Sequence, residues 1–167
     1  MPCEGPVHLR RAAAEDAAGI ASVHNEAWLQ AHKDLVPPEA LYCMSDSLRE
    51  QFWRAELLVE SHDRTPWLAM IDERIIGFAV GGLTRDDDAD SGTGEIYQLF
   101  VDPECWSQGI RTNLVEHVVR DLRQRGFERV TFWVLSGDMD MRALMIYLRW
   151  QDDGVTRFEE CGGTQHG

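Results

Sequence analysis

The chain has 167 residues, of which 44% are hydrophobic and 27% charged, and its formal net charge is −13. This length suits one domain, which we expect to span residues 1–167, and no run approaches the ~20 consecutive apolar residues of a membrane span. The acidic balance repels phosphate backbones and so disfavours nucleic-acid binding, whereas it favours a cationic partner.

The N-terminal segment lacks the cationic and then apolar pattern of a signal peptide, so we expect a cytoplasmic protein. The four cysteines are scattered without CxxC spacing, at Cys3, Cys43, Cys105 and Cys161. This spacing predicts reduced thiols and indicates neither a disulfide framework nor a zinc site. No His, Asp or Glu cluster has metal-ligand spacing, so no metal is expected.

Strands and helices alternate in the first third of the chain. Apolar spacing predicts a strand over His8–Arg11, a helix over Glu15–Ala31, a helical turn after Pro37, and a helix ending at Leu58. Ser45 or Asp46 is expected to cap that last helix. Its predicted apolar face carries Leu48, Phe52, Ala55 and Leu58.

The middle of the chain predicts a three-stranded antiparallel meander. Its strands are expected at Trp67–Ile71, Ile75–Leu83 and Glu95–Val101. The segment Thr84–Gly94 joins the last two strands and is rich in aspartate. Two interpretations of this acidic run are open, namely a solvated loop or a contact for a cationic ligand.

The remaining elements continue the mixed pattern. An amphipathic helix is expected after Gly109, with its apolar face formed by Ile110, Leu114, Val115, Val118, Val119 and Leu122. Gly126 is expected to close that helix. A strand over Val130–Leu135, a helix from Asp138 to about Arg149 and a final strand over Val155–Cys161 complete the predicted α/β fold with a mixed sheet.

The most informative segment runs from Glu95 to Leu114. A strand ends at Asp102-Pro103, and a short loop then leads through Gly109 into a helix N-terminus. Unpaired N–H groups and the helix dipole suit a pyrophosphate at this point, and glycine permits close approach of the backbone. The same arrangement is also common in α/β proteins for structural reasons alone.

The context of this segment is more specific. The strand ending in Val-Asp-Pro-Glu is followed by Trp-x-x-Gly-Ile, Leu-x-x-His-Val-Val, Arg-Gly-Phe-Glu-Arg-Val-Thr and Trp-Val-Leu-Ser-Gly. Over about His8 to Gly154 the chain closely resembles the GNAT N-acetyltransferase superfamily, as a divergent member. The resemblance implies a mixed, mostly antiparallel central sheet flanked by helices, with a last strand that is short or missing. It also implies transfer of an acetyl group from acetyl-CoA to a primary amine of a small molecule or peptide by direct attack.

The resemblance further implies site residues. The expected CoA-binding set comprises Leu99, Phe100, Val101, Ser107, Gln108, Gly109, Ile110, Arg111, Thr112 and Asp138. Trp28, His32 and Tyr97 are the expected acceptor-side residues. His32 is a base, part of the pocket wall or a surface residue at a helix end, and Tyr97 lines the pocket or belongs to the core. Glu95 is the preferred general base if its apolar neighbours raise its pKa, and otherwise an exposed carboxylate at a strand end.

Several positions depart from the family pattern. Arg111 replaces a small residue of the phosphate loop, and Arg149 replaces a glycine that normally closes the last helix. Met145 stands where relatives carry a tyrosine near the CoA sulfur. Tyr147 is the alternative catalytic tyrosine, but it reaches that place only after a register shift.

These departures leave two hypotheses open. The first is an acetyl-CoA-dependent N-acetyltransferase acting on a cationic amine, with homodimerisation as a remedy for the short sheet edge. The second is a protein of the same fold that has lost acetyl transfer and binds another ligand or performs other chemistry.

Overall fold

The computed structural model describes residues 3–42, 45–59 and 62–157. Five strands form one sheet in the order β1-β2-β3-β4-β5, namely β1 (Val7–Arg11), β2 (Trp67–Ile71), β3 (Arg74–Leu83), β4 (Thr93–Val101) and β5 (Arg129–Phe132). The first four strands pair antiparallel, and β5 pairs parallel to β4. The predicted meander and mixed sheet are therefore confirmed.

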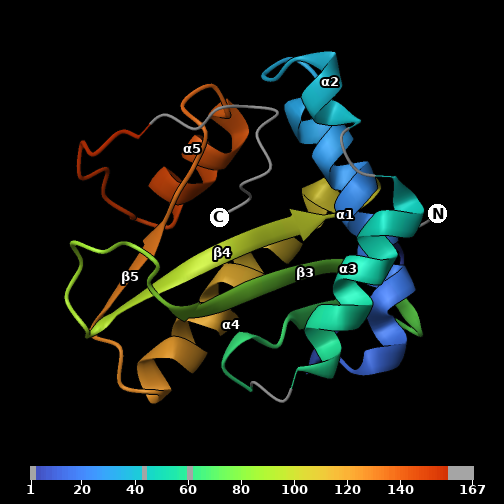
Figure 1. The fold of residues 1–167 in the computed structure, drawn as a ribbon, viewed down its shortest axis with the longest axis horizontal. Coiled ribbons are helices and arrows are strands. Elements are labelled where there is room, and N and C mark those ends of the chain that lie inside the picture. The colour runs from blue at the N-terminus through green and yellow to red at the C-terminus, as the bar shows by residue number, and fades with distance from the viewer. Residues whose placement is uncertain (1–2, 43–44, 60–61, 158–167) are drawn as a thin grey trace.

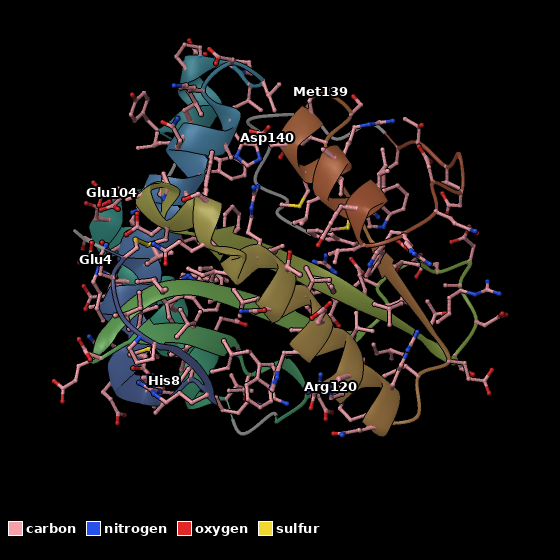
Figure 2. The ribbon with its side chains drawn as sticks, turned by 180° about the vertical axis from the view of Figure 1, so that it is seen from behind. Glu4, His8, Glu104, Arg120, Met139 and Asp140 are labelled. Atoms are coloured by element: carbon pink, nitrogen blue, oxygen red, sulfur yellow. A yellow bond between two sulfur atoms is a disulfide. The ribbon has the colours of Figure 1, made fainter. Side chains whose placement is uncertain are left out.

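Helices cover both faces of this sheet (Figure 1). One face packs against α1 (Ala17–His32) and α3 (Asp46–Leu58), and the short α2 (Pro38–Leu41) follows α1. The other face packs against α4 (Ile110–Gln124), which crosses in front of the sheet in the reversed view of Figure 2, and α5 (Met139–Tyr147) borders β5.

The predicted apolar face of α3 is wrong. Leu48, Phe52 and Leu58 are exposed, whereas Arg49 and Trp53 are buried. Trp53 packs on Phe78 in the core between α1 and the sheet, and His24 on α1, itself buried, accepts a hydrogen bond of 3.1 Å from Trp53 Nε1. The predicted face omitted Trp53, and apolar spacing carries no information about a polar partner on the facing helix.

The predicted face of α4 is confirmed. Ile110, Leu114, Val115, Val118 and Leu122 are buried against the sheet. The helix approaches β3 so closely that a Cβ on Gly81 would lie 2.7 Å from Val118. Such a distance is too short for two carbon atoms, so glycine is required for this contact.

The expectation that all cysteines are reduced is wrong. Cys3 and Cys105 form a disulfide that joins the segment before β1 to η3 (Pro103–Gln108), the 3-10 helix after β4. The two residues are 102 positions apart in the chain, so sequence spacing gave no sign of their proximity.

β5 is shorter than predicted, because it ends at Phe132 and the chain then turns toward α5. The final strand predicted from Val155 does not form over Val155–Arg157, and its remaining positions lie outside the described residues. Within the described ranges, no helix is both long and apolar enough to cross a membrane.

Candidate functional site

A pocket of about 750 Å³ opens where β4 and β5 separate. The β4–β5 ladder ends at the pair Ile96–Phe132, whereas β4 continues to Val101. The edge of β4 over residues 97–101 is therefore not covered by β5, and it forms one wall of the pocket. Side chains from α1, α3, η3, α4 and the segment from β5 into α5 supply the rest.

A β-bulge decides which β4 side chains face α1. Val80 pairs with Gln98 and Gly81 pairs with Ile96, so Tyr97 is the extra residue. Gln98 shares a sheet face with Phe100, two residues on, and with its partner Val80, which packs in the α1 and α3 core, whereas the bulge leaves Ile96 in the core on the α4 side. Gln98 lines the pocket, and sequence reasoning missed it because alternation assigns it to the opposite face from Tyr97.

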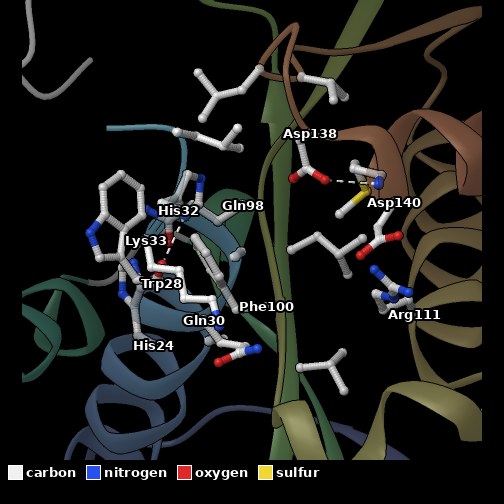
Figure 3. A pocket seen from close by; sticks show the side chains of 18 of the residues that line it. His24, Trp28, Gln30, His32, Lys33, Gln98, Phe100, Arg111, Asp138 and Asp140 are labelled. Atoms are coloured by element: carbon white, nitrogen blue, oxygen red, sulfur yellow. Dashed lines mark hydrogen bonds between the residues drawn. The ribbon is translucent and has the colours of Figure 1, made fainter. Parts of the chain in front are cut away.

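His32 lies at the end of α1 on the same side of β4 (Figure 3). It is 8% exposed, and its ring stacks on the Trp28 indole at a centroid distance of 3.9 Å. Nδ1 lies 3.0 Å from the carbonyl oxygen of Trp28. A carbonyl can only accept, so Nδ1 carries the proton and Nε2 keeps its lone pair.

Burial lowers the pKa of His32, although the Trp28 carbonyl and the charge of Asp138 oppose that shift. The ring is therefore neutral at pH 7. Trp28 and His32 both line the pocket, as expected for acceptor-side residues, but the surface position typical of a histidine at a helix end does not apply here.

Figure 3 shows β4 running between His32, Trp28 and Phe100 on one side and Arg111 and Asp140 on the other. Asp138 begins α5, where its Oδ1 accepts a hydrogen bond of 2.9 Å from the Met141 amide. The Arg111 guanidinium lies 5.3 Å from the centre of the Trp106 ring, and the Trp106 indole donates to the carbonyl oxygen of Val101 at 2.8 Å.

The residues expected to bind the phosphates, at positions 107–112, differ in whether they line the pocket. Gly109 has a φ of 70° and α4 starts directly after it, with no side chain capping its first turn. Ile110 is fully buried, so only its main chain is available to a ligand. Arg111 lines the pocket together with Leu99, Phe100, Val101 and Asp138, whereas Ser107, Gln108, Gly109, Ile110 and Thr112 do not.

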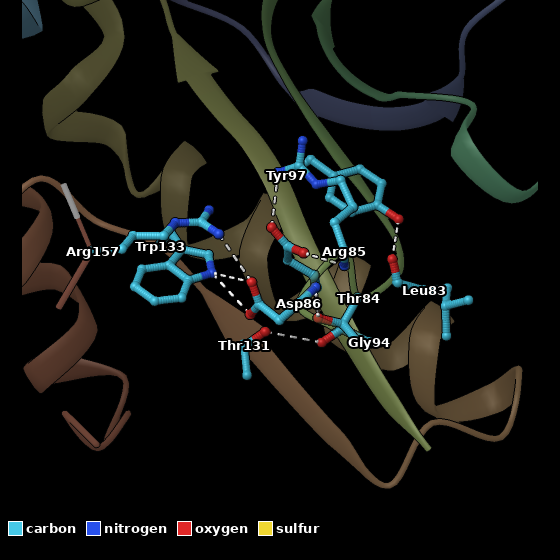
Figure 4. Close-up of polar contacts among 10 residues, drawn as sticks. Leu83, Thr84, Arg85, Asp86, Gly94, Tyr97, Thr131, Trp133 and Arg157 are labelled. Atoms are coloured by element: carbon cyan, nitrogen blue, oxygen red, sulfur yellow. Dashed lines mark hydrogen bonds and ion pairs between the residues drawn. The ribbon is translucent and has the colours of Figure 1, made fainter. Parts of the chain in front are cut away.

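Glu95 is not exposed at the end of its strand, and it does not line the pocket. It is 1% exposed, and its two carboxylate oxygens accept from the Arg85 guanidinium and the Arg85 amide, both at 2.8 Å. The Arg85 guanidinium lies 4.4 Å from the centre of the Tyr97 ring (Figure 4), and the Tyr97 hydroxyl donates to the carbonyl oxygen of Leu83. Burial raises the pKa of Tyr97, and this residue also lines the pocket.

The last helix places no tyrosine in the pocket. Tyr147 is 75% exposed and does not line the pocket, whereas Met145 is buried in the same core cluster as the inward residues of α4. The register shift that would bring Tyr147 inward does not occur.

Trp133 is a lining residue that sequence reasoning also missed. Its indole Nε1 donates to both carboxylate oxygens of Asp86, at 3.0 and 3.1 Å, and the Arg157 guanidinium lies 4.0 Å above its ring (Figure 4). Arg157 also pairs with Asp86 at 3.0 Å. The acidic loop is thus partly structural, because one of its aspartates holds a pocket wall in place.

Within the described residues, no group of His, Cys, Asp or Glu is arranged to hold a metal ion. The pocket offers main-chain edges, two histidines (His24 and His32), three cationic side chains (Lys33, Arg49 and Arg111) and aspartate side chains. Such a set suits an extended, phosphorylated ligand that meets a nucleophile beside His32.

Solved structures with the same fold include acetyltransferases. The PaiA N-acetyltransferase from Thermoplasma acidophilum, in complex with coenzyme A, has a TM-score of 0.70 and 17% identity, covering 86% of this chain and 88% of that one. An aminoglycoside acetyltransferase from an uncultured soil metagenomic sample, in complex with sisomicin, has a TM-score of 0.66 and 17% identity, and the match covers 92% of this chain and 95% of that one.

At the sequence level, the chain is 28% identical over 132 residues to the uncharacterized N-acetyltransferase YuaI from Bacillus subtilis (strain 168), which covers 78% of this chain and 72% of that protein. The model of the acetyltransferase (GNAT) family matches residues 21–148. The chain therefore belongs to the GNAT acetyltransferase family.

Proposed function

We propose that the chain transfers an acetyl group from acetyl-CoA to a primary amine, with His32 as the general base. The observation that carries this proposal is the meeting, in one pocket, of the uncovered β4 edge and a buried neutral histidine with a lone pair at Nε2.

The described residues fit acetyl-CoA. The start of α4 has no side-chain cap after Gly109, so its first amides are available to the pyrophosphate, and Arg111 adds a cation beside them. Main-chain groups of β4 beyond Ile96 would pair with the pantetheine arm, since β5 has left that edge. Bound acetyl-CoA supplies the thioester carbonyl that the amine attacks.

The amine must lose a proton before it can attack. Neutral His32 accepts that proton at Nε2, while the Trp28 carbonyl holds the opposite side of the ring and the negative charge of Asp138 stabilises the imidazolium. Main-chain N–H groups of β4 would stabilise the charge that develops on the carbonyl oxygen.

Departure of the thiolate needs no tyrosine in this scheme. A thiol with a pKa of about 8.5 is a good leaving group at neutral pH. This is consistent with the positions of Met145, which is buried in the core, and Tyr147, which lies outside the pocket.

The first test is calorimetric titration with acetyl-CoA, followed by thiol release with a panel of primary amines. Micromolar binding and amine-dependent thiol release would support the proposal. An Arg111→Gly variant tests whether the loop is obstructed: if only this variant binds acetyl-CoA, the parent site is blocked and the function lies elsewhere.

His32→Gln tests the base. Loss of one general base lowers kcat by about 10²- to 10⁴-fold, and acetyl-CoA binding should be retained because His32 lies across β4 from Arg111. An unchanged kcat in this variant would rule out His32 as the base.

A further inference from the structure

The pocket opens directly beyond the last pair of the β4–β5 ladder, Ile96–Phe132. The next residue on each side is aromatic and lines the pocket, namely Tyr97 on β4 and Trp133 in the segment that follows β5. From this point on, main-chain pairing no longer fixes the distance between the β4 wall and the wall formed by residues 133–135. Other contacts must therefore hold the two walls at their observed separation.

Two consecutive residues of the loop between β3 and β4 contact these two aromatic side chains. The Arg85 guanidinium lies 4.4 Å from the centre of the Tyr97 ring and pairs with the buried Glu95 carboxylate at 2.8 Å. The Asp86 carboxylate accepts hydrogen bonds of 3.0 and 3.1 Å from Trp133 Nε1, one at each oxygen. One loop therefore binds to both walls at the position where the strands separate (Figure 4).

A third segment reinforces the contact between Asp86 and Trp133. Arg157 pairs with the Asp86 carboxylate at 3.0 Å, and its guanidinium lies 4.0 Å from the centre of the Trp133 ring. The Asp86 side chain is only 13% exposed, so water competes little for its oxygens. Hydrogen bonds to a charged acceptor are the strong class, and they strengthen further away from water. These contacts favour one position of the Trp133 ring over others.

We propose that Asp86, on a loop that Arg85 anchors to β4, is a positioning residue that fixes the Trp133 wall and keeps the pocket preformed for acetyl-CoA. This inference rests on the proposed function and adds a residue to it. Neither Arg85 nor Asp86 lines the pocket, so Asp86 acts through Trp133 and not by touching a ligand. A preformed site spares the ligand the cost of ordering the protein, so Asp86 acts on affinity and not on the chemical step.

The first measurement, ¹⁵N NMR relaxation of the full chain, needs no ligand. In the parent we expect order parameters of about 0.85, typical of rigid backbone, for the amides of residues 133–135, and a similarly rigid Trp133 indole. In Asp86→Ala we expect these values to fall toward about 0.6, while those of α4 stay unchanged. Asp87→Ala, which changes an exposed aspartate of the same loop, is the matched control and should leave both regions rigid.

The second measurement is calorimetric titration with acetyl-CoA. We expect Asp86→Ala to lower the affinity about tenfold, and Asp86→Asn, whose amide oxygen still accepts from the indole, to stay within about threefold of the parent. In a Trp133→Phe background Asp86→Ala should have no further effect, because the donor of the shared hydrogen bond is already absent. In thiol-release assays, the KM of Asp86→Ala for acetyl-CoA should rise about tenfold with kcat within about threefold of the parent.

Unchanged order parameters over residues 133–135 in Asp86→Ala would overturn the positioning role. An affinity loss that persists in the Trp133→Phe background, or a lower kcat at unchanged KM, would overturn it as well. If the parent does not bind acetyl-CoA, the proposed function fails, and the relaxation data still decide whether Asp86 fixes the wall. If the parent transfers acetyl groups and Asp86→Ala binds acetyl-CoA as tightly as the parent, only the positioning role fails.

Discussion

Replacement of Glu95 tests whether this buried carboxylate stabilises the fold or acts in catalysis. Its side chain is 1% exposed and accepts two hydrogen bonds of 2.8 Å from Arg85, while the Arg85 side chain is 34% exposed. Glu95→Gln keeps one acceptor and removes the charge. Because Arg85 can turn toward water, we expect a loss of about 1–2 kcal/mol of unfolding free energy rather than the larger cost of a fully buried orphan charge.

For a chain of this length, that loss lowers Tm by roughly 2–8 °C. Glu95→Ala also removes the acceptor for the Arg85 amide and leaves a cavity, so we expect about 3 kcal/mol. Thermal unfolding and urea titration measure both variants, with Asp90→Asn in the exposed part of the same loop as the control.

Thiol release measured well below the lower Tm then decides the role of Glu95. If Glu95 only stabilises the fold, we expect the kcat of Glu95→Gln to lie within about threefold of the parent value. Loss of a general base would instead lower kcat by about 10²-fold or more. A kcat of Glu95→Gln that is a hundredfold lower at unchanged Tm would refute our reasoning and would identify Glu95 as the general base.

Three further perturbations follow from single contacts. Burial lowers the pKa of His32, so we expect kcat/KM to fall only as the pH becomes more acidic. The midpoint of that fall should lie below the usual histidine pKa of about 6.5, and a midpoint above it would contradict a buried neutral base. The same shift lowers the unfolding free energy as pH falls through that range, because the unfolded state binds the proton more readily. Reduction of the Cys3–Cys105 disulfide, or Cys3→Ser, should lower the unfolding free energy by about 2–4 kcal/mol, and an unchanged Tm after complete reduction would show that the link contributes nothing. Arg149 has a φ of 63°, so Arg149→Gly should raise the unfolding free energy by about 1 kcal/mol in urea titrations, whereas a loss would mean that the arginine side chain stabilises this turn.

Sequence patterns determined most of the architecture. The three-stranded meander and the buried face of α4 follow from short-range periodicity, which each segment carries by itself. The glycine at the start of α4 and the aspartate that caps α5 are likewise local signals. The family resemblance assigned Leu99, Phe100 and Val101 to the CoA site; all three line the pocket, and their binding of CoA stays a prediction.

Tertiary structure alone decided which side chains are available for chemistry. Arg85 pairs with Glu95, and a bulge at Tyr97 places Ile96 and Gln98 on opposite faces of β4. The buried position of His32 and the Cys3–Cys105 link likewise depend on residues far apart in the chain. Periodicity reports only whether a segment has an apolar side, whereas hydrogen-bond partners, burial and charge at a site arise from contacts that form after the segments have packed.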